Sequence, residues 1–150
     1  SGGPVSCLCW RDCIVCREVK EIQNQMTNSN SKAFDLEDRL VAYAGEIALF
    51  VEKLPKTYPC DYYGKQVTRS SGGTALNFGE FQGTISDKDY VHKMNLSVKE
   101  LKESRMSIKI LKYIKAYDAT ILDNILDETE QLIAILSKII INKQKKMNEK

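Results

Sequence analysis

The stretch 118–141, DATILDNILDETEQLIAILSKIII, decides the fold class. Its apolar residues recur every three or four positions, as they do along one face of a helix, and Asp118 or Thr120 can cap the start. They form two adjacent stripes, Ile121, Ile125, Leu132, Ile135 and Ile139 in one and Leu122, Leu126, Ile133, Leu136 and Ile140 in the other. Because so broad an apolar face can serve two neighbours, we expect this helix to pack among others.

The segment before this stretch predicts another long helix. Ser86 followed by Asp89 resembles an N-cap, in which a side-chain oxygen accepts hydrogen bonds from free backbone N–H groups. The helix is expected to run to about Lys115. Its apolar stripe has spacings of four and three and consists of Tyr90, Met94, Ser97, Leu101, Ser104, Ile108 and Leu111.

Two more amphipathic segments precede these. Apolar residues across 36–54 predict a first helix, which Pro55 and Pro59 are expected to end. A second helix is expected from near Asp61, with a stripe of Val67, Ser71, Thr74, Phe78 and Phe81.

Gly72-Gly73 interrupt the second segment. Two interior glycines cost about 1 kcal/mol each relative to Ala, so we expect them to permit close contact with a neighbouring helix. Four amphipathic segments joined by short links predict an all-α fold, an antiparallel up-down-up-down four-helix bundle. The 150 residues leave no room for a second full domain.

The chain is expected to divide at a polar break before the first helix. Residues 1–32 read as a tag remnant and a Cys-rich leader, and residues 33–150 as the bundle with a basic C-terminal tail. No secretory signal is visible, and the apolar run 132–141 is too short for a bilayer, so we expect a cytoplasmic protein that makes no membrane contact.

The charge balance and residue counts limit the function classes. With 22 Lys plus Arg against 20 Asp plus Glu, the chain is not polybasic as a whole. One His excludes a multi-histidine metal site, and no nucleotide-binding motif or catalytic pair is present. We therefore expect no enzyme activity, no cofactor and no small-molecule substrate.

The leader offers one weak metal site. Cys7, Cys9, Cys13 and Cys16 form C-x-C-x3-C-x2-C, and four thiolates can hold a tetrahedral Zn²⁺. Because no second C-x2-C pair and no His follow at a suitable distance, we expect these four cysteines to be inert thiols rather than metal ligands. A metal or redox module remains an alternative function, and Cys60 is expected to be a free thiol.

The second segment resembles the helical proteins encoded in intervening sequences of bacterial 23S ribosomal RNA, the S23 family. The resemblance rests on Tyr63-Gly64, Gln66, Arg69-Ser70-Ser71, Asn77, Glu80, Ser86-Asp87-Lys88-Asp89-Tyr90, Ser97 and Glu100-Leu101. Gly73-Thr74-Ala75 and Phe81 depart from the family pattern, which has Ser-Ile-Pro and Gly there.

This resemblance implies a non-catalytic four-helix bundle, often a homopentamer. Related bundles are accessory proteins of diversity-generating retroelements, where they bind a reverse transcriptase and nucleic acid. It marks a family polar motif of Gln66, Arg69, Asn77 and Glu80, whose last three residues lie on neighbouring turns and could form a polar network at an interface.

The sequence offers two candidate binding surfaces, one for a second subunit and one for nucleic acid. We expect a homo-oligomer, with the interface candidates Ile133, Leu136 and Ile140, because a single chain would leave one stripe of the last helix exposed. Basic residues spaced three, four and three along the third helix, Lys102, Arg105, Lys109 and Lys112, are candidates for binding RNA or DNA. The alternative is that acidic residues of the fourth helix screen them, leaving a purely structural oligomer.

Overall fold

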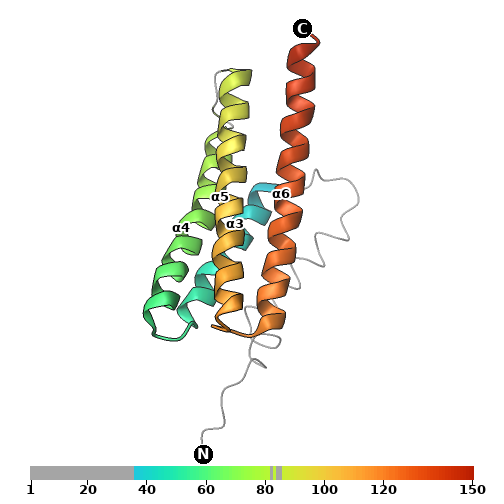
Figure 1. The fold of residues 1–150 in the computed structure, drawn as a ribbon. Coiled ribbons are helices and arrows are strands. Elements are labelled where there is room, and N and C mark those ends of the chain that lie inside the picture. The colour runs from blue at the N-terminus through green and yellow to red at the C-terminus, as the bar shows by residue number, and fades with distance from the viewer. Residues whose placement is uncertain (1–35, 82, 84–85) are drawn as a thin grey trace, which may run out of the picture. The chain divides into compact units, whose positions relative to one another are not determined.

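The computed structural model describes residues 36–81, 83 and 86–150 of the chain. These contain four helices, α3 (Leu36–Glu52), α4 (Tyr58–Phe81), α5 (Asp87–Tyr113) and α6 (Ala119–Asn148). The chain reverses direction at each link (Figure 1), so the helices run antiparallel within one unit. The predicted all-α four-helix bundle is confirmed. The leader, with its four cysteines, lies outside the described residues.

The starts of α5 and α6 confirm the predicted caps. The Ser86 side chain accepts from the backbone N–H of Asp89 at 3.1 Å, and the Asp118 side chain accepts from that of Ile121 at 3.0 Å. Each carboxylate or hydroxyl satisfies an N–H group that has no partner inside the helix. Of the two cap candidates for α6, the structure selects Asp118, and Thr120 lies in the first turn.

The prediction that both prolines end the first helix is half wrong. The helix α3 ends at Glu52, and Pro55 lies in the link that follows. Pro59, however, is the second residue of α4, which begins three residues before the expected Asp61. Proline is tolerated there because the N–H groups of a first helical turn have no intrahelical acceptor.

The end of α5 is closed by a residue in the left-handed region. The backbone N–H of Ala116 donates to the carbonyl of Leu111, and that of Lys115 donates to the carbonyl of Lys112, both at 3.0 Å. This pair of bonds is the Schellman pattern, which requires the left-handed conformation that Lys115 adopts at φ 55°.

Replacing Lys115 with Gly is expected to stabilise the fold by about 1 kcal/mol, because glycine adopts this conformation without the steric cost of a Cβ. Urea denaturation followed by circular dichroism measures the change. Lys115→Ala is the control, since it removes the charge and keeps the Cβ. Equal free energies of unfolding for the two variants would contradict the backbone explanation.

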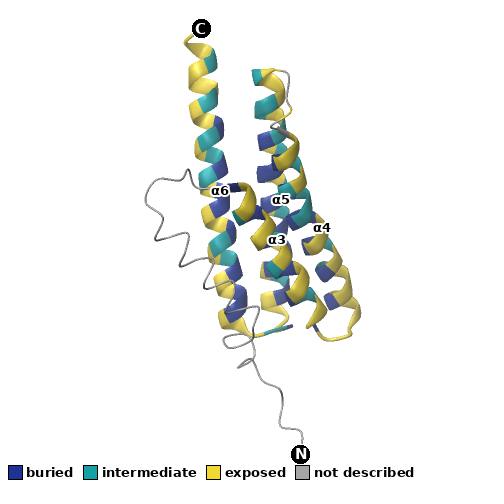
Figure 2. Ribbon diagram, turned by 180° about the vertical axis from the view of Figure 1, so that it is seen from behind, coloured by how far each residue is buried: buried dark blue, intermediate teal, exposed yellow. Residues whose placement is uncertain are grey.

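The core contains most of the predicted α5 stripe. From Met94 to Leu111 every residue of the α5 stripe is buried, and only Tyr90 at its start is half-buried. Figure 2 shows the buried residues on the inward faces of the helices. The side chain of Phe81 lies outside the described residues.

The α6 stripe that contains the interface candidates is used inside the single chain. Leu136 is fully buried, and Ile133 and Ile140 keep only 9% and 7% of their surface exposed. The expectation that a single chain leaves this stripe open is therefore wrong. A wide apolar face can be buried against more than one helix of the same bundle, so its width alone does not indicate a subunit interface.

Buried hydroxyl groups join the helices at mid-height. The hydroxyls of Tyr43 on α3 and Thr129 on α6 lie 2.7 Å apart, and those of Ser70 on α4 and Ser104 on α5 lie 2.6 Å apart. Burial raises the pKa of Tyr43 to about 12, although hydrogen bonds to Thr129 and Ser104 partly oppose the shift. These pairs fix which helix faces which, since an unpaired buried hydroxyl is costly.

The glycines of α4 behave differently from one another. A Cβ on Gly73 would lie 3.3 Å from the Glu100 side chain of α5, whereas one on Gly72 would meet nothing within 4 Å. The expected close contact is therefore present at Gly73 alone. Gly64 has the tightest site, because a Cβ there would lie 2.9 Å from the Val51 side chain of α3.

Candidate nucleic-acid interface

One strip on the solvent-facing side of α5 carries basic and neutral residues, and the exposed Asp89 lies beside it at the start of the helix. Each residue of this strip lies two positions before a residue of the α5 stripe, or before the position where the next stripe residue would fall. Two positions turn a helix by about 200°, so the strip lies on the side opposite the core. We call it the outer α5 face, and all of its members are exposed: Lys88, His92, Asn95, Lys99, Lys102, Met106, Lys109 and Tyr113. At a rise of 1.5 Å per residue, it is about 38 Å long.

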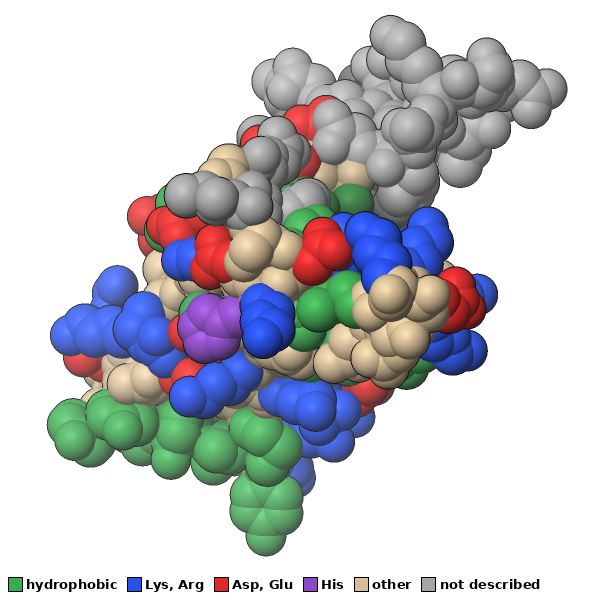
Figure 3. All heavy atoms as spheres, turned by 90° about the horizontal axis from the view of Figure 1, so that it is seen from above, with side chains coloured by type: hydrophobic (Ala, Val, Ile, Leu, Met, Phe, Trp, Pro, Cys, Tyr) green, Lys and Arg blue, Asp and Glu red, His purple; other side chains and the backbone are tan. Residues whose placement is uncertain are grey.

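The lysines of the outer α5 face are available to an external partner. None of Lys88, Lys99, Lys102 and Lys109 has an ion pair with another described residue. Viewed from the end of the bundle, Lys and Arg side chains lie around the histidine (Figure 3). Such a row presents positive charge that no described carboxylate pairs with.

The structure divides the predicted basic stripe in two. Arg105 Nη1 lies 3.1 Å from a Glu130 carboxylate oxygen, and Lys112 Nζ lies 2.5 Å from Asp123 Oδ1, both on α6. Lys102 and Lys109 point outward instead. The screening alternative is thus observed for one half of the stripe, and the prediction of a single four-residue stripe needs correction.

Three acidic residues beside the outer α5 face are themselves paired. Arg69 of α4 contacts both Glu100, at 3.4 Å, and Glu103. Lys93 Nζ lies 2.6 Å from Glu80 Oε2. Because these carboxylates are paired with cations of their own, they reduce the positive potential of the lysine row less than free carboxylates would.

The family polar motif does not form one network. Arg69 and Glu80 make separate ion pairs with α5, and Asn77 Nδ2 donates to the Gly73 carbonyl within α4 at 2.9 Å. Gln66 is half-buried. Arg69 and Glu80 are exposed, so these residues share no network within the single chain, and a polar network at an interface between chains stays a prediction.

The C-terminal end of α6 returns to the start of α5. Lys143 Nζ lies 2.6 Å from Asp87 Oδ1 and 5.1 Å from the centre of the Tyr90 ring. This hydrogen bond lowers the pKa of Asp87. Lys145 and Lys146 are exposed beyond it, so the predicted basic tail adds charge near the His92 end of the outer α5 face.

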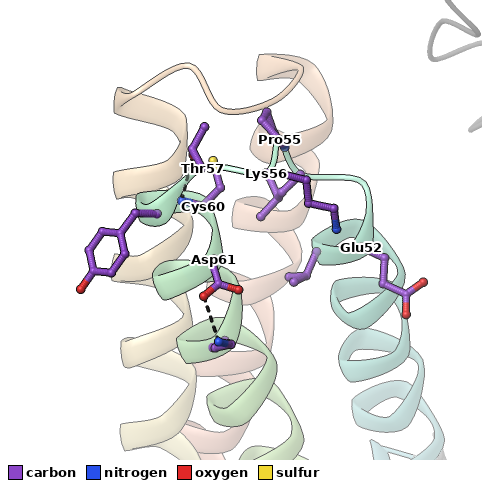
Figure 4. Close-up of a pocket in the computed structure, with 10 residues that line it drawn as sticks. Glu52, Pro55, Lys56, Thr57, Cys60 and Asp61 are labelled. Atoms are coloured by element: carbon purple, nitrogen blue, oxygen red, sulfur yellow. Dashed lines mark hydrogen bonds and ion pairs between the residues drawn. The ribbon is translucent and has the colours of Figure 1, made fainter.

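The hollow at the link between α3 and α4 offers little chemistry. Pro55, Thr57 and Cys60 line it, and Asp61 there is paired with Lys65 at 2.9 Å (Figure 4). Cys60 is a free, buried thiol, as predicted. Within residues 36–81, 83 and 86–150, no three His, Cys, Asp or Glu side chains gather to hold a metal ion.

One solved structure with a similar fold is a protein of unknown function from the S23 ribosomal protein family of Bacteroides thetaiotaomicron VPI-5482. Its TM-score is 0.65 at 20% identity, and the match covers 69% of this chain and 96% of that one. This similarity shows the shared fold. No protein-family model and no curated protein matches the chain. Among the described helices, none has the length and apolar character needed to cross a bilayer.

Proposed function

We propose that the protein is a non-catalytic bundle that binds RNA or DNA through the outer α5 face. The observation that carries this proposal is the row of lysines that form no ion pair with any described residue, along a strip of α5 whose own members are basic or neutral. A phosphate backbone is the partner that such a row fits, because each Lys–phosphate contact releases condensed counterions and adds salt-sensitive affinity.

The arrangement of ion pairs supports binding over a merely solvated surface. The basic residues that border α6 have acidic partners there, whereas the outward lysines pair with no acidic residue in the part of the chain that the structure describes. Tyr113 and Met106 stand among the lysines and are 88% and 53% exposed. An exposed aromatic ring beside a basic row can stack on an unpaired base, which favours structured RNA with loops or single-stranded ends.

The proposed role is that of an accessory module. A ribonucleoprotein or a reverse transcriptase is the kind of larger partner that the family resemblance implies, and the bundle would contribute a rigid basic edge to it. A face formed on one long helix keeps the lysine spacing fixed, so phosphate contacts form with little loss of backbone entropy.

The experiment compares two charge-matched variants. Lys102→Gln with Lys109→Gln removes two outward lysines, and Arg105→Gln with Lys112→Gln removes two cations that are paired with α6. RNA and DNA hairpins are titrated at several salt concentrations. The outward variant is expected to bind more weakly and to reduce the slope of log affinity against log salt by about 0.7 to 0.9 per lost contact.

The paired variant is expected to retain the wild-type salt slope, since its cations already have carboxylate partners. Circular dichroism confirms that both variants keep the fold. Equal losses in the two variants would assign the binding to net charge rather than to the outer α5 face. Wild-type protein without salt-dependent binding would remove the proposed function.

A further inference from the structure

The exposed tyrosines of the chain gather at one end of the bundle. Of the seven tyrosines, three are exposed, namely Tyr58, Tyr62 and Tyr113. Tyr58 begins α4 and Tyr113 ends α5, and these two helix ends lie at the same, lower end of the bundle in Figure 1. A single exposed apolar residue is ordinary, but a group of them is typical of a surface that binds another molecule.

The two tyrosines of α4 lie on the side of that helix that borders α5. Tyr58 and Tyr62 precede Arg69 by eleven and seven residues, so both lie within about 20° of Arg69 around the helix. Arg69 itself contacts Glu100 and Glu103 of α5. The two rings therefore stand beside α5, in line with this pair of ion contacts.

The register of the two helices sets these rings level with the end of α5. Because α4 and α5 are antiparallel, seven residues back from Arg69 in α4 correspond to seven residues onward from its partner Glu103 in α5. Those steps lead to Tyr62 and to Ile110. Tyr62 thus lies at the height of Ile110, near the end of the outer α5 face.

Ile110 joins the α4 tyrosines to the outer α5 face. It is half-buried, and Met106 and Tyr113 lie within about 60° of it around α5. Seen from the end of the bundle, hydrophobic side chains gather along the edge where α4 and α5 lie (Figure 3). We call this continuous surface the tyrosine end, and its members are Tyr58, Tyr62, Met106, Ile110 and Tyr113.

The rings of α4 already form a stack. The Tyr58 and Tyr62 rings lie 6.4 Å apart between centroids with 28° between their planes, and Tyr63 meets Tyr62 edge-on at 5.1 Å. Tyr58 ends this stack and is 81% exposed. A planar ligand that lies on Tyr58 continues a stack that the protein has begun, so little side-chain entropy is lost on binding.

Lysines border the tyrosine end. Lys109 is next to Ile110 in the chain, and Lys56 and Lys115 lie two residues outside the ends of α4 and α5. All three are exposed, and none has an ion pair with a described residue. Asp61, which lies between the two α4 tyrosines in the chain, is paired with Lys65 at 2.9 Å.

This combination of rings and cations fits nucleic acid better than protein. Lysine is depleted in protein–protein interfaces. Proteins that bind single strands combine cations, which follow the phosphates, with aromatic rings, on which the bases stack. The tyrosine end has both, and it continues the lysine row of the outer α5 face.

We propose that the tyrosine end binds unpaired nucleotides, so that the ligand of the outer α5 face is a duplex that continues into a single strand. This inference rests on the proposed function, in which the lysine row holds the duplex. Neighbouring helix axes lie about 8 to 10 Å apart, the length of roughly three stacked nucleotides at about 3.4 Å each. Stacking is sequence-tolerant, so the single strand is bound without strong base preference.

Three RNA hairpins with one common stem test the proposal. One is blunt, one carries a short single-stranded tail, and one carries an abasic tail with the same phosphates but no bases. Wild-type protein is expected to bind the natural tail more tightly than the abasic tail, by about tenfold for each stacked base. A fluorescent base analogue in the tail should be quenched on binding, because it stacks on a ring.

Two double variants separate the ring from its bulk. Tyr58→Leu with Tyr62→Leu is expected to remove both the preference for the natural tail and the quenching. Tyr58→Phe with Tyr62→Phe keeps the rings and is expected to keep both effects. Circular dichroism checks that the variants remain folded, which the exposure of both side chains predicts.

The blunt hairpin distinguishes this inference from the proposed function. If the blunt hairpin binds with a salt dependence that Lys102→Gln with Lys109→Gln reduces, the proposed function stands. Equal binding of natural and abasic tails then overturns the inference alone. Unchanged tail binding by the leucine variant also overturns it and leaves the tyrosine end to a protein partner. No binding of any hairpin removes both proposals.

Discussion

Replacing Ile133 and Ile140 with Asp is expected to unfold the protein. Both side chains are at least nine-tenths buried in the single chain. An isolated carboxylate in an apolar core costs several kcal/mol, and a whole domain is stable by only about 5 to 15 kcal/mol. The same substitutions would separate subunits of folded protein if the two isoleucines lay at an interface.

Ile141→Asp is the matched control on the same helix, because Ile141 is 51% exposed. Circular dichroism during heating distinguishes the outcomes. We expect loss of the cooperative helical transition in the double variant and a change within about 0.5 kcal/mol in the control. A folded, monomeric double variant from an oligomeric wild type would contradict the placement of these residues in the core.

Removing the hydroxyl of Tyr43 is expected to destabilise the bundle by about 1 to 2 kcal/mol and to change its response to alkali. Tyr43→Phe leaves the buried Thr129 hydroxyl without its 2.7 Å partner on α3. Burial holds the pKa of Tyr43 at about 12, above the ordinary value of 10.0. The folded state therefore resists deprotonation more strongly than the unfolded chain.

The sign of the pH effect follows from this raised pKa. The contribution of Tyr43 is fully present below the unfolded pKa of 10.0 and is lost as the pH rises toward about 12. The loss is on the order of 2 to 3 kcal/mol. Urea melts from pH 9 to 12 should show the wild type losing its advantage over Tyr43→Phe. A constant difference across that range would contradict the burial of the hydroxyl.

The fold could be predicted from sequence because burial controls periodicity. The α5 stripe from Met94 to Leu111 appears in the sequence at spacings of four and three, and the structure buries every member. The Ser86 and Asp118 caps were predictable for the same local reason, since they follow from side-chain chemistry next to a helix start. The link around Pro59 was not, because proline suits both the end of one helix and the first turn of the next.

The candidate site was predicted only in part, because periodicity does not fix which neighbour a residue faces. A step of three residues turns a helix by about 300°, so Arg105 and Lys112 lie about 60° from Lys102 and Lys109. That rotation is enough to bring the first pair to the α6 carboxylates. The outer α5 face could have been found by counting two places back from each core residue.

The apolar side of α3 could not be interpreted from sequence alone. Val41, Ala42, Ala48 and Leu49 look like additional core positions until the structure shows that they face solvent. The same holds for Ile133, Leu136 and Ile140, whose burial depends on where the other helices lie.

The most direct test of the central claim is to map the binding site by NMR. An RNA hairpin is added at low salt to isotope-labelled protein, and amide shifts are followed together with the ring signals of His92, the single histidine. We expect shift changes to concentrate on the outer α5 face, from Lys88 to Tyr113, and to leave the exposed residues of α3 between Val41 and Leu49 unchanged. Changes centred on Val41 to Leu49, or none on α5, would contradict it.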